Sequence, residues 1–163
     1  MDAREIVENY FRQREISYVL YEHPALFTVA DVYAAGVHKE GVVGAKNLFL
    51  TNLEHTKYFL YVLPDTLRAD LKSFALLVGE KKMQFASPEE LKKYLKLTPG
   101  SVSLCGLLND PEKKVGVYVH EGVYDAERMH LHPNVNTASM ELTHEALGKY
   151  LKSLEREVSV VSE

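Results

Sequence analysis

The sequence predicts a mixed α/β fold, in which a mixed, partly antiparallel sheet forms a barrel-like core with flanking helices. Strand-like apolar runs alternate with helix-like segments, but without the regular strand–helix–strand order of a doubly wound parallel sheet. Two of the runs, 46–50 and 57–63, are separated only by a polar turn, which predicts an antiparallel hairpin. The chain has 163 residues and no visible linker or repeat, so we expect one domain spanning 1–163.

The first elements follow from local signals. Apolar residues recur at helical spacing between Ile6 and Phe11, which predicts an N-terminal helix. A strand is expected over 16–21, where β-branched and aromatic residues gather. Thr28 and Asp31 fit a capping box, so a short helix is expected over 29–35. The hairpin described above comes next.

The middle of the chain carries two clear helix signals. A helix is expected over 70–78, with Gly79 as its stop. After a brief strand at 83–86, the run Ser87-Pro88-Glu89-Glu90 predicts a second helix, because it places a cap, a proline and two acids at the helix start.

The last part of the chain is predicted to add strands and a closing helix. The apolar run 102–108 is interpreted as a strand, and 115–120 alternates as a further one. The segment 130–136 is expected to be partly loop, and 137–142 to be the last central strand. Thr143 is expected to cap a final amphipathic helix.

Composition and charge exclude several classes of protein. The net charge of −4 excludes a generically basic nucleic-acid binder, although a local basic groove remains compatible with it. A single cysteine, Cys105, excludes an internal disulfide and the usual thiolate zinc site. The N-terminus has no apolar signal region, and no apolar run reaches membrane-spanning length. We therefore expect a soluble cytoplasmic domain that contacts no membrane.

Two positions are candidates for chemistry on a carbonyl or phosphate. Lys46 begins an apolar strand just after a loop of small residues, so its ammonium can reach a ligand that the backbone lets approach. The alternative is a solvated lysine at a strand end. In the segment 98–103, Gly100 is followed by Ser101, and such a loop exposes backbone N–H groups that can hold an oxyanion. The alternative there is an ordinary turn.

Histidine and cysteine offer weaker possibilities. His130 and His132 have the alternate spacing with which a strand can present two metal ligands, but no third ligand is apparent. Hydrogen bonding to a ligand or a loop carbonyl is the alternative for them. Cys105 can act as a nucleophile only with a histidine partner, and its apolar surroundings favour a buried, inert thiol.

Lysines fall in small groups, at 81–82, 92–96, 113–114 and 149–152. Most such groups form the solvated faces of helices and turns. Two groups that flank one cleft, however, can follow a phosphate backbone. The sequence does not distinguish these arrangements.

An ordered set of short stretches runs from about residue 16 to the last helix. It consists of His23-Pro24 with Phe27-Thr28-Val29, Lys46-Asn47-Leu48-Phe49-Leu50, Asp70-Leu71-Lys72, Thr98-Pro99-Gly100-Ser101-Val102 with Leu107, Asn109 and Asp110, and His132-Pro133 with Asn136-Thr137. This set resembles the YbaK/ProX family of free-standing aminoacyl-tRNA deacylases. Within that family it is most similar to the members that remove alanine from proline tRNA (the ProXp-ala or PrdX type).

The resemblance implies both a fold and a reaction. The fold is a mixed sheet curled into a barrel-like core, and the reaction is hydrolysis of the ester that joins a wrong amino acid to tRNA. The family lysine corresponds to Lys46, and the glycine of the family's G-x-x-x-P loop corresponds to Gly100. The fifth position of that loop is Leu104 instead of proline, which leaves the shape of the loop open.

The resemblance also implies roles for residues around the substrate. Phe27 and Val29 are expected to form the wall that excludes proline, with Thr28 and Ser101 nearby in the substrate site. His132 and Asn136 are expected to shape the site of the terminal adenosine. The chemistry implied is substrate-assisted, with a ribose hydroxyl helping the water, and it needs no cofactor, metal or covalent intermediate. The expected partners are the acceptor end of a mischarged tRNA and prolyl-tRNA synthetase.

Three alternatives remain open at this stage. A deacylase for cysteine or serine on proline tRNA would share the fold and differ in the size of its pocket. A non-catalytic module that binds tRNA ends or a synthetase would have no use for Lys46 and Gly100, although Leu104 is compatible with it. A metal hydrolase would use His130 and His132.

Overall fold

A computed structural model describes residues 1–25, 28–34, 36 and 39–162. Its helices and strands alternate irregularly along the chain. In order they are α1 (Ala3–Gln13), β1 (Val19–Glu22), α2 (Val29–Ala34), β2 (Val43–Asn52), β3 (Tyr58–Pro64), α3 (Leu71–Val78), β4 (Met83–Phe85), α4 (Pro88–Leu95), the 3-10 helix η1 (Leu104–Asn109), β5 (Val115–His120), α5 (Glu121–Tyr124), β6 (Arg128–Leu131), β7 (Ala138–Thr143), α6 (His144–Ser153) and β8 (Val158–Val161).

The strands form one mixed sheet with the order β1-β7-β6-β2-β3-β5-β8, and β4 pairs with β2 outside this path. The pairs β1–β7, β2–β3, β2–β4 and β6–β7 are antiparallel. The pairs β2–β6, β3–β5 and β5–β8 are parallel. The prediction of a mixed sheet with flanking helices is therefore confirmed, while a β1–β8 pairing that would close a barrel is not among the pairings of the described strands.

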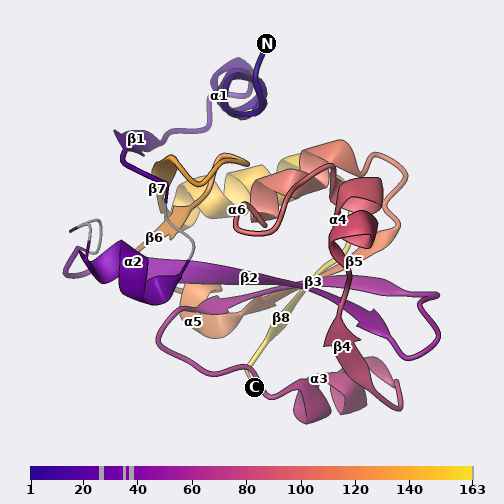
Figure 1. The fold of residues 1–163 in the computed structure, drawn as a ribbon. Coiled ribbons are helices and arrows are strands. Elements are labelled where there is room, and N and C mark those ends of the chain that lie inside the picture. The colour runs from indigo at the N-terminus through magenta and orange to yellow at the C-terminus, as the bar shows by residue number, and fades with distance from the viewer. Residues whose placement is uncertain (26–27, 35, 37–38, 163) are drawn as a thin grey trace.

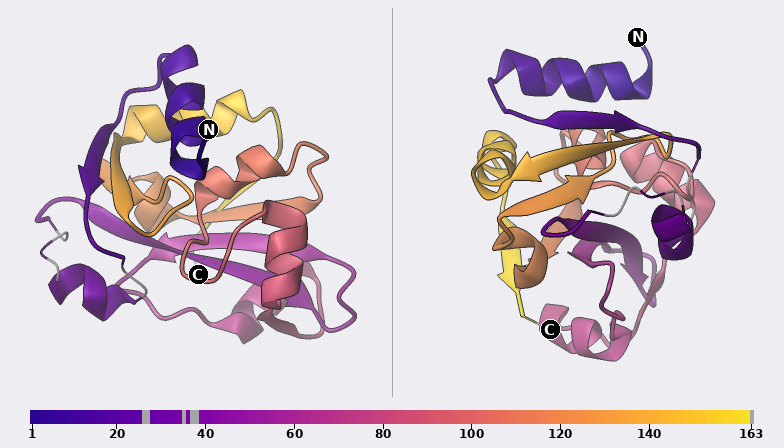
Figure 2. Two further views of the ribbon diagram at one scale, coloured as in Figure 1. Left: turned by 45° about the horizontal axis from the view of Figure 1, so that its top comes forward. Right: turned by 90° about the vertical axis from the view of Figure 1, so that its left-hand side faces the viewer.

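Helices cover both faces of this sheet (Figure 1). The larger core lies between the sheet and helices α1, α4 and α6, where Phe11 of α1 stacks on Tyr150 of α6 with ring centroids 5.1 Å apart. The smaller core lies on the other face, where Phe74 of α3 packs on Tyr61 of β3. Figure 2 shows α1 and β1 together at one end of the molecule, and the C-terminus beside α3 at the other.

The local signals for helices are confirmed where a side chain caps the first turn. Thr28 and Asp31 form the reciprocal bonds expected at the start of α2. Asp70 caps α3, which ends at Gly79 in the left-handed conformation. Ser87 forms a full capping box with Glu90 at α4, and Thr143 caps α6. These caps satisfy N–H groups that have no partner inside the helix.

The strand predicted over 102–108 is wrong. Its apolar residues instead form η1, whose first turn is capped by the hydroxyl of Ser103, which accepts a bond from the N–H of Cys105 at 3.0 Å. A short apolar run is buried equally well as a strand or as a helical turn, so its periodicity did not distinguish the two. The sequence also gave no sign of α5 or β8.

Candidate active site

The site is built around an interruption in the pairing of β2. One edge of this strand pairs with β3 from Ala45 to Thr51. The other edge pairs with β6 only at residues 43–44 and with β4 only at residues 50–52. Among the described strands, the residues 45–48 therefore have a free edge on that side, where a ligand or a loop can approach the backbone.

A pocket of about 300 Å³ opens at this edge. It is bounded by β2, the end of β4, the first turns of α4 and the loop 98–103, and its lining includes Asn47, Phe49, Phe85, Leu91, Gly100 and Val102. Asn47 and Gly100, which are far apart in the sequence, thus share one cavity. Its walls are otherwise mostly apolar, as in sites that accept small uncharged groups.

The side chain of Asn47 makes this pocket a candidate binding site. Its Oδ1 and Nδ2 atoms are both buried, and neither has a hydrogen-bond partner among the described residues. Leaving a buried polar group without a partner costs about 1–3 kcal/mol. A bound ligand that pairs with this amide would remove that cost. The sequence analysis did not select Asn47, although a polar residue inside an apolar strand was an available signal.

Lys46 lies next to Asn47 but on the other face of the strand, because successive side chains of a strand alternate. It is half-buried, its backbone pairs with Leu63, and it forms no ion pair with a described carboxylate. Lys46 is not among the residues that line the pocket.

The loop that carries Gly100 presents unused backbone donors. Gly100 has a φ of 89°, a region that side-chain-bearing residues rarely adopt. The N–H of buried Ser101 donates to the carbonyl of Thr98 at 3.0 Å, whereas the N–H groups of Gly100 and Val102 donate to no backbone carbonyl of the described residues. Such groups can stabilise a negatively charged oxygen.

The structure explains why leucine is accepted in place of the family proline. Leu104 is the first residue of η1 and is fully buried, with its carbonyl accepting a bond from the hydroxyl of Tyr150 at 3.0 Å. Proline also fits the first position of a helix, because the N–H there has no partner inside the helix. Leucine and proline can therefore occupy this position with the same backbone.

Residues 132–134 pack against this loop. The hydroxyl of Ser103 donates to the carbonyl of His132, and Asn134 Nδ2 donates to the carbonyl of Cys105 at 3.3 Å. His132 Nδ1 and Asn134 Oδ1 are buried without a partner among the described residues. Burial lowers the pKa of His132, and the nearby His23 and His130 lower it further, so its imidazole is neutral at physiological pH.

The remaining predicted site residues are placed as follows. Asn136 is partly buried, and no contact of its side chain is found among the described residues; the neighbouring Asn134, which was not selected, makes the contact instead. Thr28 uses its hydroxyl to cap α2. Phe27 lies outside the described residues, and so does the side chain of Val29, the first residue of α2.

The other candidates for chemistry are engaged elsewhere. Cys105 is buried, and burial raises the pKa of its thiol to about 12, as expected for an inert core residue. His130 Nε2 lies 3.5 Å from Glu141 Oε1. Within the described part of the chain, no three histidine, cysteine or acidic side chains come together as metal ligands.

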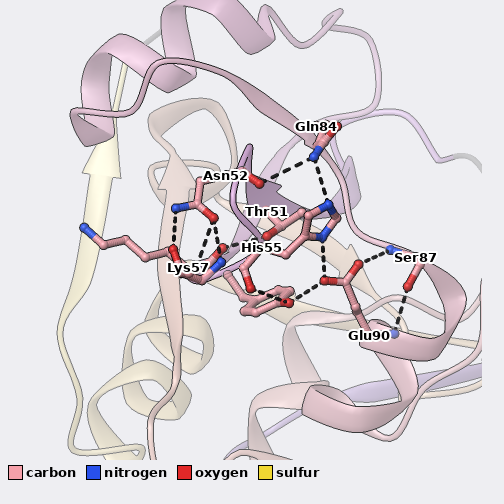
Figure 3. A network of polar contacts seen from close by, with 9 residues as sticks. Thr51, Asn52, His55, Lys57, Gln84, Ser87 and Glu90 are labelled. Atoms are coloured by element: carbon pink, nitrogen blue, oxygen red, sulfur yellow. Dashed lines mark hydrogen bonds and ion pairs between the residues drawn. The ribbon is translucent and has the colours of Figure 1, made fainter.

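A polar network fixes the wall of the pocket that α4 forms (Figure 3). Glu90 of α4 accepts hydrogen bonds from His55, at the tip of the β2–β3 hairpin, at 2.9 Å, and from the hydroxyl of Tyr58. Its other oxygen accepts the N–H of Ser87 at 2.9 Å. Tyr58 in turn stacks on Phe49, which lines the pocket. The network therefore sets the position of α4 relative to β2.

Replacing Glu90 with glutamine is expected to destabilise the fold by roughly 2 kcal/mol at pH 7, since it turns the charge-assisted bonds from Tyr58 and His55 into neutral ones and weakens the capping box. Burial raises the pKa of Glu90, but the bonds from Ser87, Tyr58 and His55 outweigh it and lower the pKa from 4.5 to about 2. The carboxylate therefore stabilises the fold fully above pH 4.5, and this contribution is lost as the pH falls through about 2.

Urea unfolding of wild type and Glu90→Gln at pH 7 and at pH 3 measures this difference. Glu89→Gln is the matched control, because Glu89 lies in the same first turn but is exposed and outside the network. A Glu90→Gln variant as stable at pH 7 as Glu89→Gln would refute this role for the network.

Taken together, the site offers backbone hydrogen-bond donors for a developing oxyanion and a pocket with an unsatisfied amide, and Lys46 lies beside Asn47 on the other face of the strand. It contains no described nucleophile paired with a base, since Cys105 is inert. Such a site can position a reactive ester for attack by water.

The comparisons with known proteins agree with this chemistry. Residues 23–150 match the family model of the aminoacyl-tRNA editing domain, so the chain belongs to that family. It is an aminoacyl-tRNA deacylase, an enzyme that hydrolyses the ester of a mischarged tRNA. No helix in the described part of the chain combines the length and the apolar character needed to cross a membrane.

Individual relatives show which members of the family this chain is similar to. The chain is 33% identical over 153 residues to the prolyl-tRNA editing protein ProX of Acetoanaerobium sticklandii, covering 94% of this chain and 93% of the relative. It is 26% identical to the prolyl-tRNA synthetase associated domain-containing protein 1 of Danio rerio, covering 99% and 88%. A crystal structure described as that of a candidate trans-editing enzyme for prolyl tRNA synthetase superposes with a TM-score of 0.74 at 19% identity, covering 99% of this chain and 96% of that chain.

Proposed function

We propose that this enzyme hydrolyses Ala-tRNA(Pro) and releases alanine from mischarged proline tRNA. The unsatisfied amide of Asn47, buried in a small, mostly apolar pocket beside Gly100, is the observation that carries the proposal. A pocket of this kind suits a small uncharged side chain. The name of the ProX relative, a prolyl-tRNA editing protein, supports proline tRNA as the carrier.

The need for such an enzyme follows from the limits of binding selectivity. A synthetase built for a larger amino acid cannot fully reject a smaller one, because one or two methylenes are worth only about 1–3 kcal/mol. A second pocket that admits only the smaller side chain then removes the product. Phe27 and Val29 remain our prediction for the wall that excludes proline.

In the proposed mechanism, water attacks the ester carbonyl, and a ribose hydroxyl of the terminal adenosine takes part in activating it. The N–H groups of Gly100 and Val102 stabilise the negative charge that develops on the carbonyl oxygen. Asn47 pairs with polar atoms of the aminoacyl group, and Lys46 orients the ester from the other side of the strand edge. His132 and Asn134 border the adenosine.

The test is the rate at which labelled amino acid is released from purified Ala-tRNA(Pro), Pro-tRNA(Pro) and Cys-tRNA(Pro). We expect release of alanine at least tenfold faster than that of proline, the selectivity that about 1.4 kcal/mol supplies. Faster release of cysteine would support the deacylation reaction but show that Cys-tRNA(Pro), and not Ala-tRNA(Pro), is the substrate. No release from any of the three by the folded protein would overturn the proposal.

A further inference from the structure

Helix α4 forms one wall of the pocket and is followed directly by the loop that carries Gly100. Pro88 and Leu91 line the pocket. The helix ends at Leu95, Lys96 caps it, and Gly100 follows four residues after Lys96. Side chains on the pocket side of α4 therefore stand beside the entrance.

The C-terminal end of this helix carries two lysines without compensation. Lys92 lies four residues after Pro88 and so shares its side of the helix, while Lys96 caps the helix in the left-handed conformation and starts the segment that leads to Gly100. Both lysines are exposed and form no ion pair with a described carboxylate.

The acids and the third lysine of α4 do not neutralise Lys92 and Lys96. Glu90 is bound by Tyr58 and His55. Glu89 is exposed and lies four residues before Lys93, so those two share a different row. Lys93 also lies over the ring of Tyr94, 5.3 Å from its centroid. Lys92 and Lys96 thus form a local positive strip on a protein whose net charge is −4.

Lysines near the end of a helix also stabilise the helix dipole, typically by 0.3–1 kcal/mol. That effect accounts for Lys92 in the last turn, but it does not require Lys92 to share the side of the helix on which Pro88 lines the pocket. A comparison with a lysine in the last turn of another helix separates the two explanations. Lys152 of α6 is exposed and occupies that position.

We propose that Lys92 and Lys96 bind the phosphates of the single-stranded 3′ end of the tRNA whose aminoacyl group occupies the pocket. This inference rests on the proposed function and assigns the surface that receives the nucleic acid. Phosphate contacts of this kind fix orientation and register without reading sequence, and they weaken with salt. The strip therefore determines how the terminal adenosine is delivered to the site.

The experiment compares Lys92→Gln/Lys96→Gln with the control Lys72→Gln/Lys152→Gln, which removes the same charge from exposed lysines of α3 and α6. The KM and kcat for Ala-tRNA(Pro) are measured across a salt series. We expect the KM of the first variant to rise by about tenfold at low salt, with kcat unchanged. The slope of log KM against the logarithm of the salt concentration should fall by about 1.4, since each of the two single-strand phosphate contacts contributes about 0.7 to it.

The control is expected to keep the wild-type KM and salt dependence, and Lys92→Arg/Lys96→Arg to restore both. If wild type hydrolyses Ala-tRNA(Pro) and the two glutamine double variants behave alike, the strip is refuted while the proposed function stands. A drop in kcat without a change in KM would also refute it.

A binding measurement keeps the inference testable if wild type hydrolyses none of the substrates. Fluorescence anisotropy then follows the binding of an RNA acceptor-stem hairpin with a CCA end. Weaker binding by Lys92→Gln/Lys96→Gln than by the control supports the strip, and equal binding overturns it. If Lys92→Gln/Lys96→Gln binds the RNA as well as the control does but no longer binds prolyl-tRNA synthetase, the two lysines bind a protein partner and the proposal is overturned.

Discussion

Replacing Lys46 with alanine is expected to lower kcat/KM for Ala-tRNA(Pro) by about a hundredfold, the scale of loss when a group that positions the substrate is removed. Lys46 is half-buried next to Asn47 in β2, and it forms no ion pair with a described carboxylate. It is therefore available to the ester or to a phosphate. The measurement is single-turnover release of labelled alanine.

The fold should tolerate this change. Lys46 contributes backbone pairing to β3 opposite Leu63, and alanine retains that pairing. Thermal unfolding should accordingly shift little. Lys152→Ala, which removes an exposed lysine from α6, is the control and should keep wild-type activity. A folded Lys46→Ala enzyme with an unchanged rate would show that this residue has no part in the reaction.

The second large effect is a loss of stability, which we expect when Arg156 is replaced. Its guanidinium donates to Asp110 Oδ2 at 2.9 Å, and the side chains of both residues are only 4% exposed. It also donates to the carbonyls of Asp110 and Val115. Removing one partner of a buried ion pair typically costs about 3–5 kcal/mol, because the other charge stays buried without compensation. We expect Arg156→Ala to lower the free energy of unfolding by about 3 kcal/mol. This is the lower end of that range, because Asp110 keeps two backbone partners.

Urea unfolding measures this loss, with Lys113→Ala as the control, since Lys113 is exposed and contacts only the carbonyl of Glu155. Equal stability of the two variants would contradict the prediction. The pair also matters for the site. Asp110 ends η1, the turn that follows the Gly100 loop, and Arg156 joins it to the segment before β8. A loosened pair should therefore reduce activity at temperatures where the fold is still largely intact.

The organisation of the site explains why the catalytic apparatus is so sparse. An aminoacyl ester is intrinsically reactive, so the enzyme mainly has to position it and exclude the wrong side chain. Donors from the Gly100 loop and an unsatisfied amide at Asn47 suffice for that in our proposal. The free edge of β2 lets both reach the same ligand, because no neighbouring strand occupies that space.

The sequence by itself determined the features that depend on neighbouring residues. Capping side chains at Thr28, Ser87 and Thr143 located three helix starts, because a cap bonds N–H groups only two or three residues away. The hairpin of β2 and β3 followed from two apolar runs and a turn. The ordered set of stretches gave the family, which the family model and the ProX relative confirm.

Only the tertiary structure decided the features that depend on distant residues. The run 102–108 became η1 because Ser103 caps it and Tyr150, from α6, bonds the carbonyl of Leu104. Asn47 became a site residue because the loop 98–103 closes a pocket over it and leaves its amide unsatisfied. Pairing across such distances depends on which surfaces meet after the chain has folded, and a local pattern of residues does not encode it.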